Sequence, residues 1–143
     1  MPKRKPVIRM SSHGIYTQWE SNSKDLPQLV EFTTRVPARI DIEFGFVVNI
    51  KGAKNQQLDY CIYHPDIPDA DGIPRPPFGG TVYVKTNDWN FFLGDTVWEP
   101  VADKVGDWRL TLELGGEIIA EKTFEVFHEE PLEPSEGAVV DRD

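Results

Sequence analysis

The sequence contains a single cysteine, Cys61, among 143 residues. One cysteine excludes an internal disulfide framework and any zinc site built from several thiolates. No window approaches the roughly 18 consecutive apolar residues of a membrane-spanning helix. The basic start (1–6) does not lead into the apolar segment of a secretory signal. We therefore expect a soluble cytoplasmic protein that neither crosses nor binds a membrane.

Basic residues are also scarce: the chain has 15 of them against 24 acidic ones, a net charge of -9. Residues 1–9 carry four basic side chains and no acid, whereas residues 128–143 carry six acids and one arginine. An acidic protein repels a phosphate backbone, so we expect no nucleic-acid partner. We predict a flexible basic arm (1–6), a folded domain (7–127) and a disordered acidic tail (128–143).

Period-two alternation of apolar residues is the strongest pattern in the sequence. Between residues 40 and 50, six apolar side chains occupy every second position, as a half-buried strand requires. Residues 108–114 repeat the pattern and lead into Gly115-Gly116, a pair that favours a tight hairpin turn. The return strand, residues 117–127, breaks its alternation at residues 118–120, where we expect a bulge.

Weaker strand patterns cover much of the remaining domain. They lie in residues 7–19, 29–36, 58–64, 81–86 and 91–97. Within the first of these, Gly14 marks a change of phase that predicts a bend or bulge. The 12 prolines and 11 glycines oppose long helices, and only a single helical turn is expected near residues 100–104. The pattern predicts an all-β fold, an antiparallel immunoglobulin-like β-sandwich of seven to eight strands.

The C-terminal hairpin carries a more particular motif. Residues 106–126 begin with Gly-x-Trp, continue with alternating apolar residues and a glycine turn, and end with Lys-x-Phe-x-Val. Two shorter pieces accompany it, Phe44-Gly-Phe46 and Val97-Trp98-Glu99. In these motifs, residues 7–127 resemble a family of small bacterial proteins classified only as a domain of unknown function. The resemblance implies an immunoglobulin-like β-sandwich, and it implies no activity and no catalytic residues.

One acidic loop is a candidate metal site. Asp66, Asp69 and Asp71 supply carboxylates of the kind that calcium prefers. Their spacing does not fit an EF-hand, and the nearby prolines favour a stiff surface turn in which aspartate needs no metal. We therefore expect no cofactor.

Catalytic groups do not form any recognisable motif. His13, His64 and His128 lack the spacing of metal ligands, so we expect strand-end or surface positions for them. Cys61 lies in a predicted strand and is expected to be a small, buried and unreactive side chain. These absences predict a protein that is not an enzyme.

Aromatic residues make up 11% of the chain. Phe91 and Phe92 are adjacent in a predicted strand, so only one of them can face the hydrophobic core. Trp89 lies in a turn-like segment just before them. The tryptophans have the alternative role of filling the core or covering a sheet edge. The preceding loop (65–80) is long and contains five prolines, which favours a functional role. We predict a recognition surface made of Trp89, Phe91, Phe92, Arg75 and Phe78.

The leading hypothesis is a non-enzymatic binding module that uses this surface for an unidentified protein partner. The second is a carbohydrate- or calcium-binding sandwich, because exposed tryptophan stacks on sugar rings and carboxylates bind calcium. A small hydrolase is the remaining alternative. The sequence leaves open a monomer and a homodimer formed through an exposed edge strand.

Overall fold

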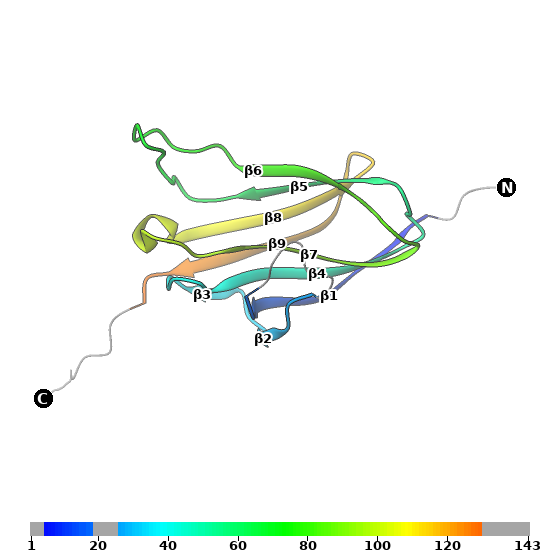
Figure 1. Cartoon of the computed structure of the whole chain (residues 1–143), viewed down its shortest axis with the longest axis horizontal. Helices are drawn as coiled ribbons and strands as arrows, with labels where there is room; N and C mark the ends of the chain where they lie inside the picture. Colours follow the sequence, from blue (N-terminus) through cyan, green and yellow to red (C-terminus); the bar gives the residue numbers. More distant parts are fainter. Residues whose placement is uncertain (1–4, 19–25, 130–143) are drawn as a thin grey trace, which may run out of the picture.

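The computed structural model describes residues 5–18 and 26–129, which form two β-sheets packed face to face (Figure 1). In spatial order the four-stranded sheet contains β2 (Leu29–Glu31), β1 (Val7–Tyr16), β4 (Glu43–Lys51) and β7 (Asp88–Thr96). The five-stranded sheet contains β3 (Arg35–Pro37), β9 (Glu117–Phe127), β8 (Gly106–Leu114), β5 (Gln57–Tyr63) and β6 (Phe78–Tyr83). The predicted helical turn is confirmed as a 3-10 turn, η1 (Val101–Lys104).

The all-β, two-sheet architecture is confirmed, with two corrections. The described part of the chain has nine strands, not seven or eight, and one strand pair, β3 with β9, is parallel. Both differences arise in residues 29–36, where alternation predicts a single strand. The chain leaves the four-stranded sheet after Glu31 and enters the five-stranded sheet at Arg35, where it runs alongside β9.

Strand β4 supplies the centre of the core. Its inward side chains are fully buried, as their alternation predicts: Phe44, Phe46, Val48 and Ile50. Ile40 and Ile42 share the alternation but precede the strand. Asp41, between them, adopts a positive φ of 71°, which interrupts the extended backbone. The strand is therefore shorter than the pattern of residues 40–50 suggests.

The two sheets are held in place by aromatic contacts. The Phe44 ring meets the rings of Trp108 and Phe124 edge to face, with centroids 5.4 Å and 5.6 Å apart. The closest approach of the sheets joins β9 with β1 and β4, and in Figure 1 β6 lies at the far margin of the five-stranded sheet. The inward side chains of β6, Phe78 and Val82, are accordingly only half-buried.

The hairpin between β8 and β9 is confirmed. Gly115 and Gly116 both adopt positive φ, 61° and 83°, in the turn. The register shifts between Leu112 and Glu113, and the extra residue on β9 is Ile119. The bulge therefore falls within the predicted residues 118–120.

A bulge also changes the phase of β1, at Ser11 and not at Gly14 as the sequence suggests. Because of this extra residue, His13 lies opposite Phe46 and points between the sheets. Burial, together with the nearby Lys122 ammonium, lowers the pKa of His13. The predicted strand-end or surface position is wrong for this histidine, which is part of the inter-sheet packing.

Three glycines lie side by side across the four-stranded sheet, because Gly14 pairs with Gly45 and Gly45 pairs with Gly94. A Cβ on Gly45 would lie 2.1 Å from the carbonyl oxygen of Leu93, so the neighbouring strand leaves no space for one. At Gly94 the space is taken by the ring of Phe92, whose Cζ would be 2.4 Å from an added Cβ. The absence of a side chain at Gly94 lets the Phe92 ring approach the backbone of this row.

Several expectations concern residues outside the described ranges. The basic arm (1–6) is described only at its end, the acidic tail (128–143) only at its start, and Trp19 not at all. Glu129 accepts hydrogen bonds from the Arg39 guanidinium, which lowers the pKa of the Glu129 carboxyl group.

Across residues 5–18 and 26–129, no helix is long and apolar enough to cross a membrane.

Gly45→Ala tests the glycine row. The new methyl group would meet the backbone of β7 at a φ of 157°, so we expect a loss of about 3 kcal/mol or more in the free energy of unfolding. Gly72→Ala is the control, since Gly72 also has a positive φ but no atom within 4 Å of the added Cβ. Its cost should be about 1 kcal/mol. Urea denaturation measures both, and equal losses would contradict this account of the row.

Candidate functional site

The five residues predicted to form one recognition surface lie in three separate places. Trp89 belongs to strand β7 and not to a turn, and its ring stacks on Phe91 with centroids 5.3 Å apart. Both rings are half-buried along the inner side of this edge strand. Phe92 points to the opposite face. Arg75 is exposed in the proline-rich loop (65–77), and Phe78 is the first residue of β6.

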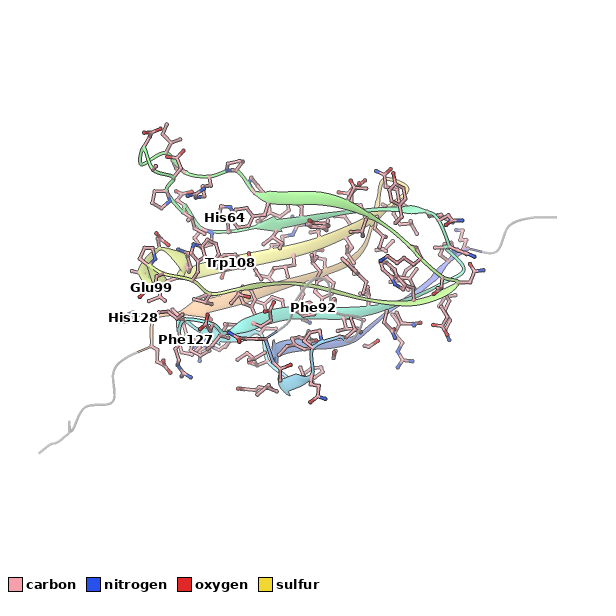
Figure 2. All side chains as sticks on the ribbon, viewed as in Figure 1. His64, Phe92, Glu99, Trp108, Phe127 and His128 are labelled. Atoms are coloured by element: carbon pink, nitrogen blue, oxygen red, sulfur yellow. The ribbon has the colours of Figure 1, made fainter. Side chains whose placement is uncertain are left out.

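Phe92 is a packing residue of the outer face (Figure 2). It is only 3% exposed and forms a small apolar cluster with Tyr16 and Val47. The Tyr16 ring meets it edge to face at 4.9 Å, and the Tyr16 hydroxyl is hydrogen-bonded to Ser12. Adjacent Phe91 and Phe92 are thus both largely shielded from water, on opposite faces of the sheet. Phe92 is therefore not available as an exposed contact for a partner.

His64 closes the proline-rich loop at the end of β5. Its Nδ1 lies 2.6 Å from the carbonyl oxygen of Pro65 and its Nε2 lies 2.9 Å from that of Pro76. The ring also packs on Phe78, with centroids 4.3 Å apart. The His64 ring therefore connects the two ends of the loop.

The three aspartates of the loop do not converge. Asp69 Oδ1 accepts hydrogen bonds from the backbone N–H groups of Asp71 and Ile73, at 2.8 Å and 3.0 Å. These bonds hold the pKa of the Asp69 carboxyl group below its usual value. Asp66 and Asp71 are exposed. In the ranges that the structure describes, no three acidic, histidine or cysteine side chains are grouped to hold a metal ion.

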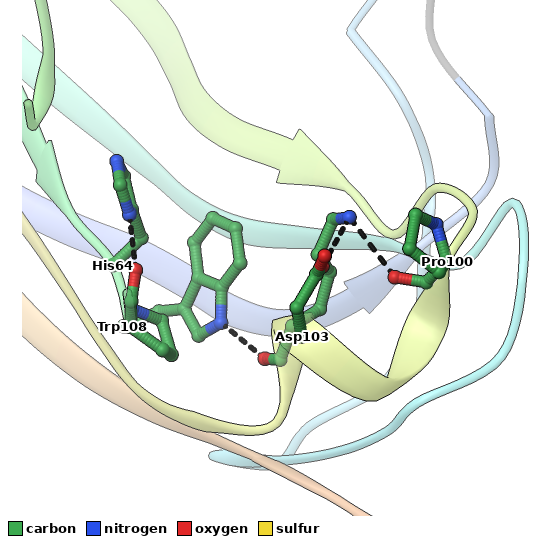
Figure 3. A network of polar contacts seen from close by, with 6 residues as sticks. His64, Pro100, Asp103 and Trp108 are labelled. Atoms are coloured by element: carbon green, nitrogen blue, oxygen red, sulfur yellow. Dashed lines mark hydrogen bonds and ion pairs between the residues drawn. The ribbon is translucent and has the colours of Figure 1, made fainter. Parts of the chain in front are cut away.

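The end of the sandwich next to this loop is sealed by a polar and aromatic network (Figure 3). The indole N–H of Trp108 donates to the carbonyl oxygen of Lys104 at 2.8 Å. The buried Lys104 ammonium donates to the Pro100 carbonyl and the Asp103 carboxylate, at 3.0 Å and 2.5 Å, and lies 4.3 Å from the Trp98 ring. A buried ammonium is costly unless it is paired in this way. Trp98 and Trp108 therefore close the core, as their alternative role predicts.

Asp95 places a carboxyl group on the inner side of β7, opposite Phe44. It accepts a hydrogen bond from the Thr96 N–H at 2.8 Å. Burial raises the pKa of Asp95, and that hydrogen bond and the positive charge of His64 oppose the shift. The sequence reasoning missed Asp95, although it continues the inward alternation of Trp89 and Phe91 along β7. It also missed the buried Lys104, which no local pattern distinguishes from a turn residue.

Strand β6 is an edge strand without the usual protection against pairing. The other edges among the described strands are short or charged: β2 and β3 have three residues each, and β7 carries Asp88 and Asp95. By contrast, the six residues of β6 include no charge and no proline. Short length, charged side chains and proline are the features by which natural proteins prevent edge-to-edge association. The β6 edge is therefore open to another strand.

The backbone direction of β6 follows from the residue after it. The Val84 N–H donates to Gln56 on the β5 side, at 2.9 Å. Backbone direction alternates along a strand, so the N–H and C=O groups of Gly79, Thr81 and Tyr83 point away from β5. On the outer face the Thr81 hydroxyl donates to Asp59 at 3.0 Å, which fixes this side chain beside the edge.

Asp95→Asn tests the cost of the buried carboxylate. Because the pKa of Asp95 is raised in the folded state, the free energy of unfolding is greatest below the pKa of the unfolded-state carboxyl group, near 3.9. This part of the stability is lost as the pH rises through the folded-state pKa of Asp95. Asparagine removes the charge and keeps the acceptor for Thr96. We expect a higher thermal midpoint than wild type at pH 7 and a smaller difference near pH 3.5. A lower midpoint at pH 7 would show that attraction to His64 outweighs burial, and exposed Asp66→Asn is the control.

His64→Phe tests the loop fastening. Phenylalanine preserves a ring next to Phe78 but removes both hydrogen bonds, so we expect faster amide hydrogen exchange in residues 66–75 with the sheets unaffected. The exposed His128→Phe serves as the matched control. Unchanged exchange in the loop would show that its prolines alone hold it in place.

Comparison with known proteins identifies the fold and a family. An immunoglobulin-like protein from Pseudomonas aeruginosa, solved by crystallography, has a similar structure, with a TM-score of 0.67 and 24% sequence identity. The match covers 84% of this chain and 96% of that one, so the immunoglobulin-like sandwich predicted from the sequence is confirmed. No curated protein matches the chain. The model of the "Domain of unknown function (DUF3859)" matches residues 4–126. As its hairpin motif suggests, the chain belongs to this DUF3859 family.

Proposed function

We propose that the chain is a non-enzymatic protein-interaction module that binds an extended segment of its partner as an added strand on β6. The observation that carries the proposal is the outer edge of β6, which has no charge and no proline. β6 pairs with β5 on one side, and no described strand pairs with its other side. The outward N–H and C=O groups of Gly79, Thr81 and Tyr83 match the backbone of any extended peptide. Backbone pairing of this kind supplies affinity without requiring a particular partner sequence.

Side chains beside the edge would supply specificity. Phe78 and Val82 are half-buried on the inner face, where the four-stranded sheet does not fully cover them. An added strand with apolar residues at alternate positions would extend the core over these two side chains. On the outer face Tyr83 is 58% exposed. Tyrosine is among the residue types that most often dominate the binding energy of protein interfaces.

The proline-rich loop supports the same role because it leads directly into β6. Its prolines and the His64 hydrogen bonds restrict the backbone just before Phe78. Such restriction lowers the entropic cost of binding at the start of the strand. Arg75 is exposed in this loop and provides a cation for an acidic group of the partner. Of the predicted recognition surface, Arg75 and Phe78 remain in this proposal.

Thr81→Pro tests the edge without disturbing the sheet. Proline removes an N–H that points away from β5, so the β5–β6 pairing is preserved while a bond to an added strand is lost. The probe is a library of displayed linear peptides of about ten residues, a typical strand length. We expect the selected peptides to bind the variant about tenfold more weakly, a change of about 1.4 kcal/mol.

Thr81→Val is the matched control for this experiment. It removes the hydroxyl that bonds Asp59 but keeps the backbone N–H, so binding of the selected peptides should persist. Thermal midpoints of both variants confirm that they are folded. If the selected peptides bind Thr81→Pro as tightly as wild type, the proposed edge is not the binding site.

A further inference from the structure

We infer that the strand added to β6 is the β6 strand of a second copy of this chain, in an antiparallel pair around a two-fold axis at Thr81. The inference rests on the proposed function, because it names the partner of the same edge. It follows from how well this edge complements itself in hydrogen bonds, side chains and charge.

The outward backbone groups of β6 fit one two-fold register. With Thr81 opposite Thr81 of the other copy, Gly79 lies opposite Tyr83, and all three outward residues of each copy are used. Each of these pairs exchanges both of its N–H···O=C bonds, as closely spaced antiparallel pairs do. Shifting the axis to Gly80 would set Tyr83 opposite Pro77, which has no N–H, and Lys85 opposite Arg75. The backbone thus favours the register centred on Thr81 over the one centred on Gly80.

Side chains on the outer face agree with this register. Tyr83 has a large exposed ring, and Gly79, its opposite residue, has no side chain, so the ring can lie over the bare backbone of the other copy. The two Thr81 side chains meet on the axis, a cross-strand pair that is favourable in antiparallel sheets. The hydroxyl of each remains bonded to its own Asp59.

Charge and shape also permit the pair. Each copy carries a net charge of -9, which opposes association, but β6 itself contributes no charge to the contact. A two-fold axis perpendicular to the sheet keeps both inner faces on one side and joins two five-stranded sheets into one. The aromatic contacts between the sheets join β4 to β8 and β9, and β6 lies on the far side of β5 from these strands. The contact involves one short strand, so we expect a weak dimer in the micromolar range.

Charge exchange at Thr81 tests the second copy directly. With Asp59→Asn also present, so that no carboxylate lies beside residue 81, Thr81→Lys places two ammonium groups opposite each other in this register, and Thr81→Glu places two carboxylates opposite each other. Each of these variants alone should be monomeric. An equal mixture should recover the dimer, because opposite charges then face each other across the axis. Sedimentation equilibrium at about 0.15 M salt, which limits repulsion between the acidic bodies, measures the mass over protein concentration.

The wild type should change from monomer to dimer as concentration rises, and Thr123→Lys, on the same outer face of the interior strand β9, should do so too. Failure of wild type to dimerise, failure of the mixture to recover the dimer, or dimerisation of Thr81→Lys would each overturn the inference. The proposed function would survive any of these results if Thr81→Pro still weakened binding of the selected peptides. It would fail together with the dimer if Thr81→Pro left peptide binding unchanged.

Discussion

The contact of Phe44 with Trp108 and Phe124 determines how the two sheets are stacked, and the rest of the structure depends on it. It aligns β4, in the middle of the four-stranded sheet, with β8 and β9 of the wider sheet. Buried apolar area, aromatic and aliphatic together, is the main source of stability in a sandwich that has only one cysteine and no disulfide. Because the narrower sheet is centred on that contact, β6 remains at an uncovered margin.

The end of the sandwich nearest the proline-rich loop makes this margin rigid. Trp108, which contacts Phe44, also donates its indole N–H to Lys104, and the Lys104 ammonium lies over Trp98. Phe78 contacts both the Trp98 and His64 rings. The first residue of β6 is therefore connected to the core, whereas the strand edge beyond it has no described neighbour. A rigid edge with free backbone groups favours recognition by strand pairing.

Local sequence patterns predicted the elements whose pairing lies close in the chain. Alternation identified β4, and the glycine pair located the β8–β9 hairpin and its bulge, because these features depend on neighbouring residues. The crossing between β2 and β3 was missed, since residues 29–36 alternate smoothly through it. The phase change in β1 was misplaced because a bulge at Ser11 depends on the pairing with β4.

The candidate site was only partly predictable for the same reason. The proline-rich loop and Phe78 were recognisable from composition, whereas the burial of Phe92 depends on Tyr16 and on a glycine row formed by three strands. The exposure of the β6 edge depends on the order of strands in the sheet, which alternation does not encode. Asp95 was the exception, because its inward position could have been read from the alternation of β7.

Amide hydrogen exchange along β6 tests the central claim, that this edge is free within one chain and pairs with another strand. At low protein concentration, the amides of Gly79, Thr81 and Tyr83 should exchange faster than those of Gly80 and Val82, which point toward β5. As concentration rises, the three outward amides should become protected while the inward ones remain unchanged. Strong protection of the outward amides at the lowest concentration would show that the chain itself covers the edge, and would contradict the account.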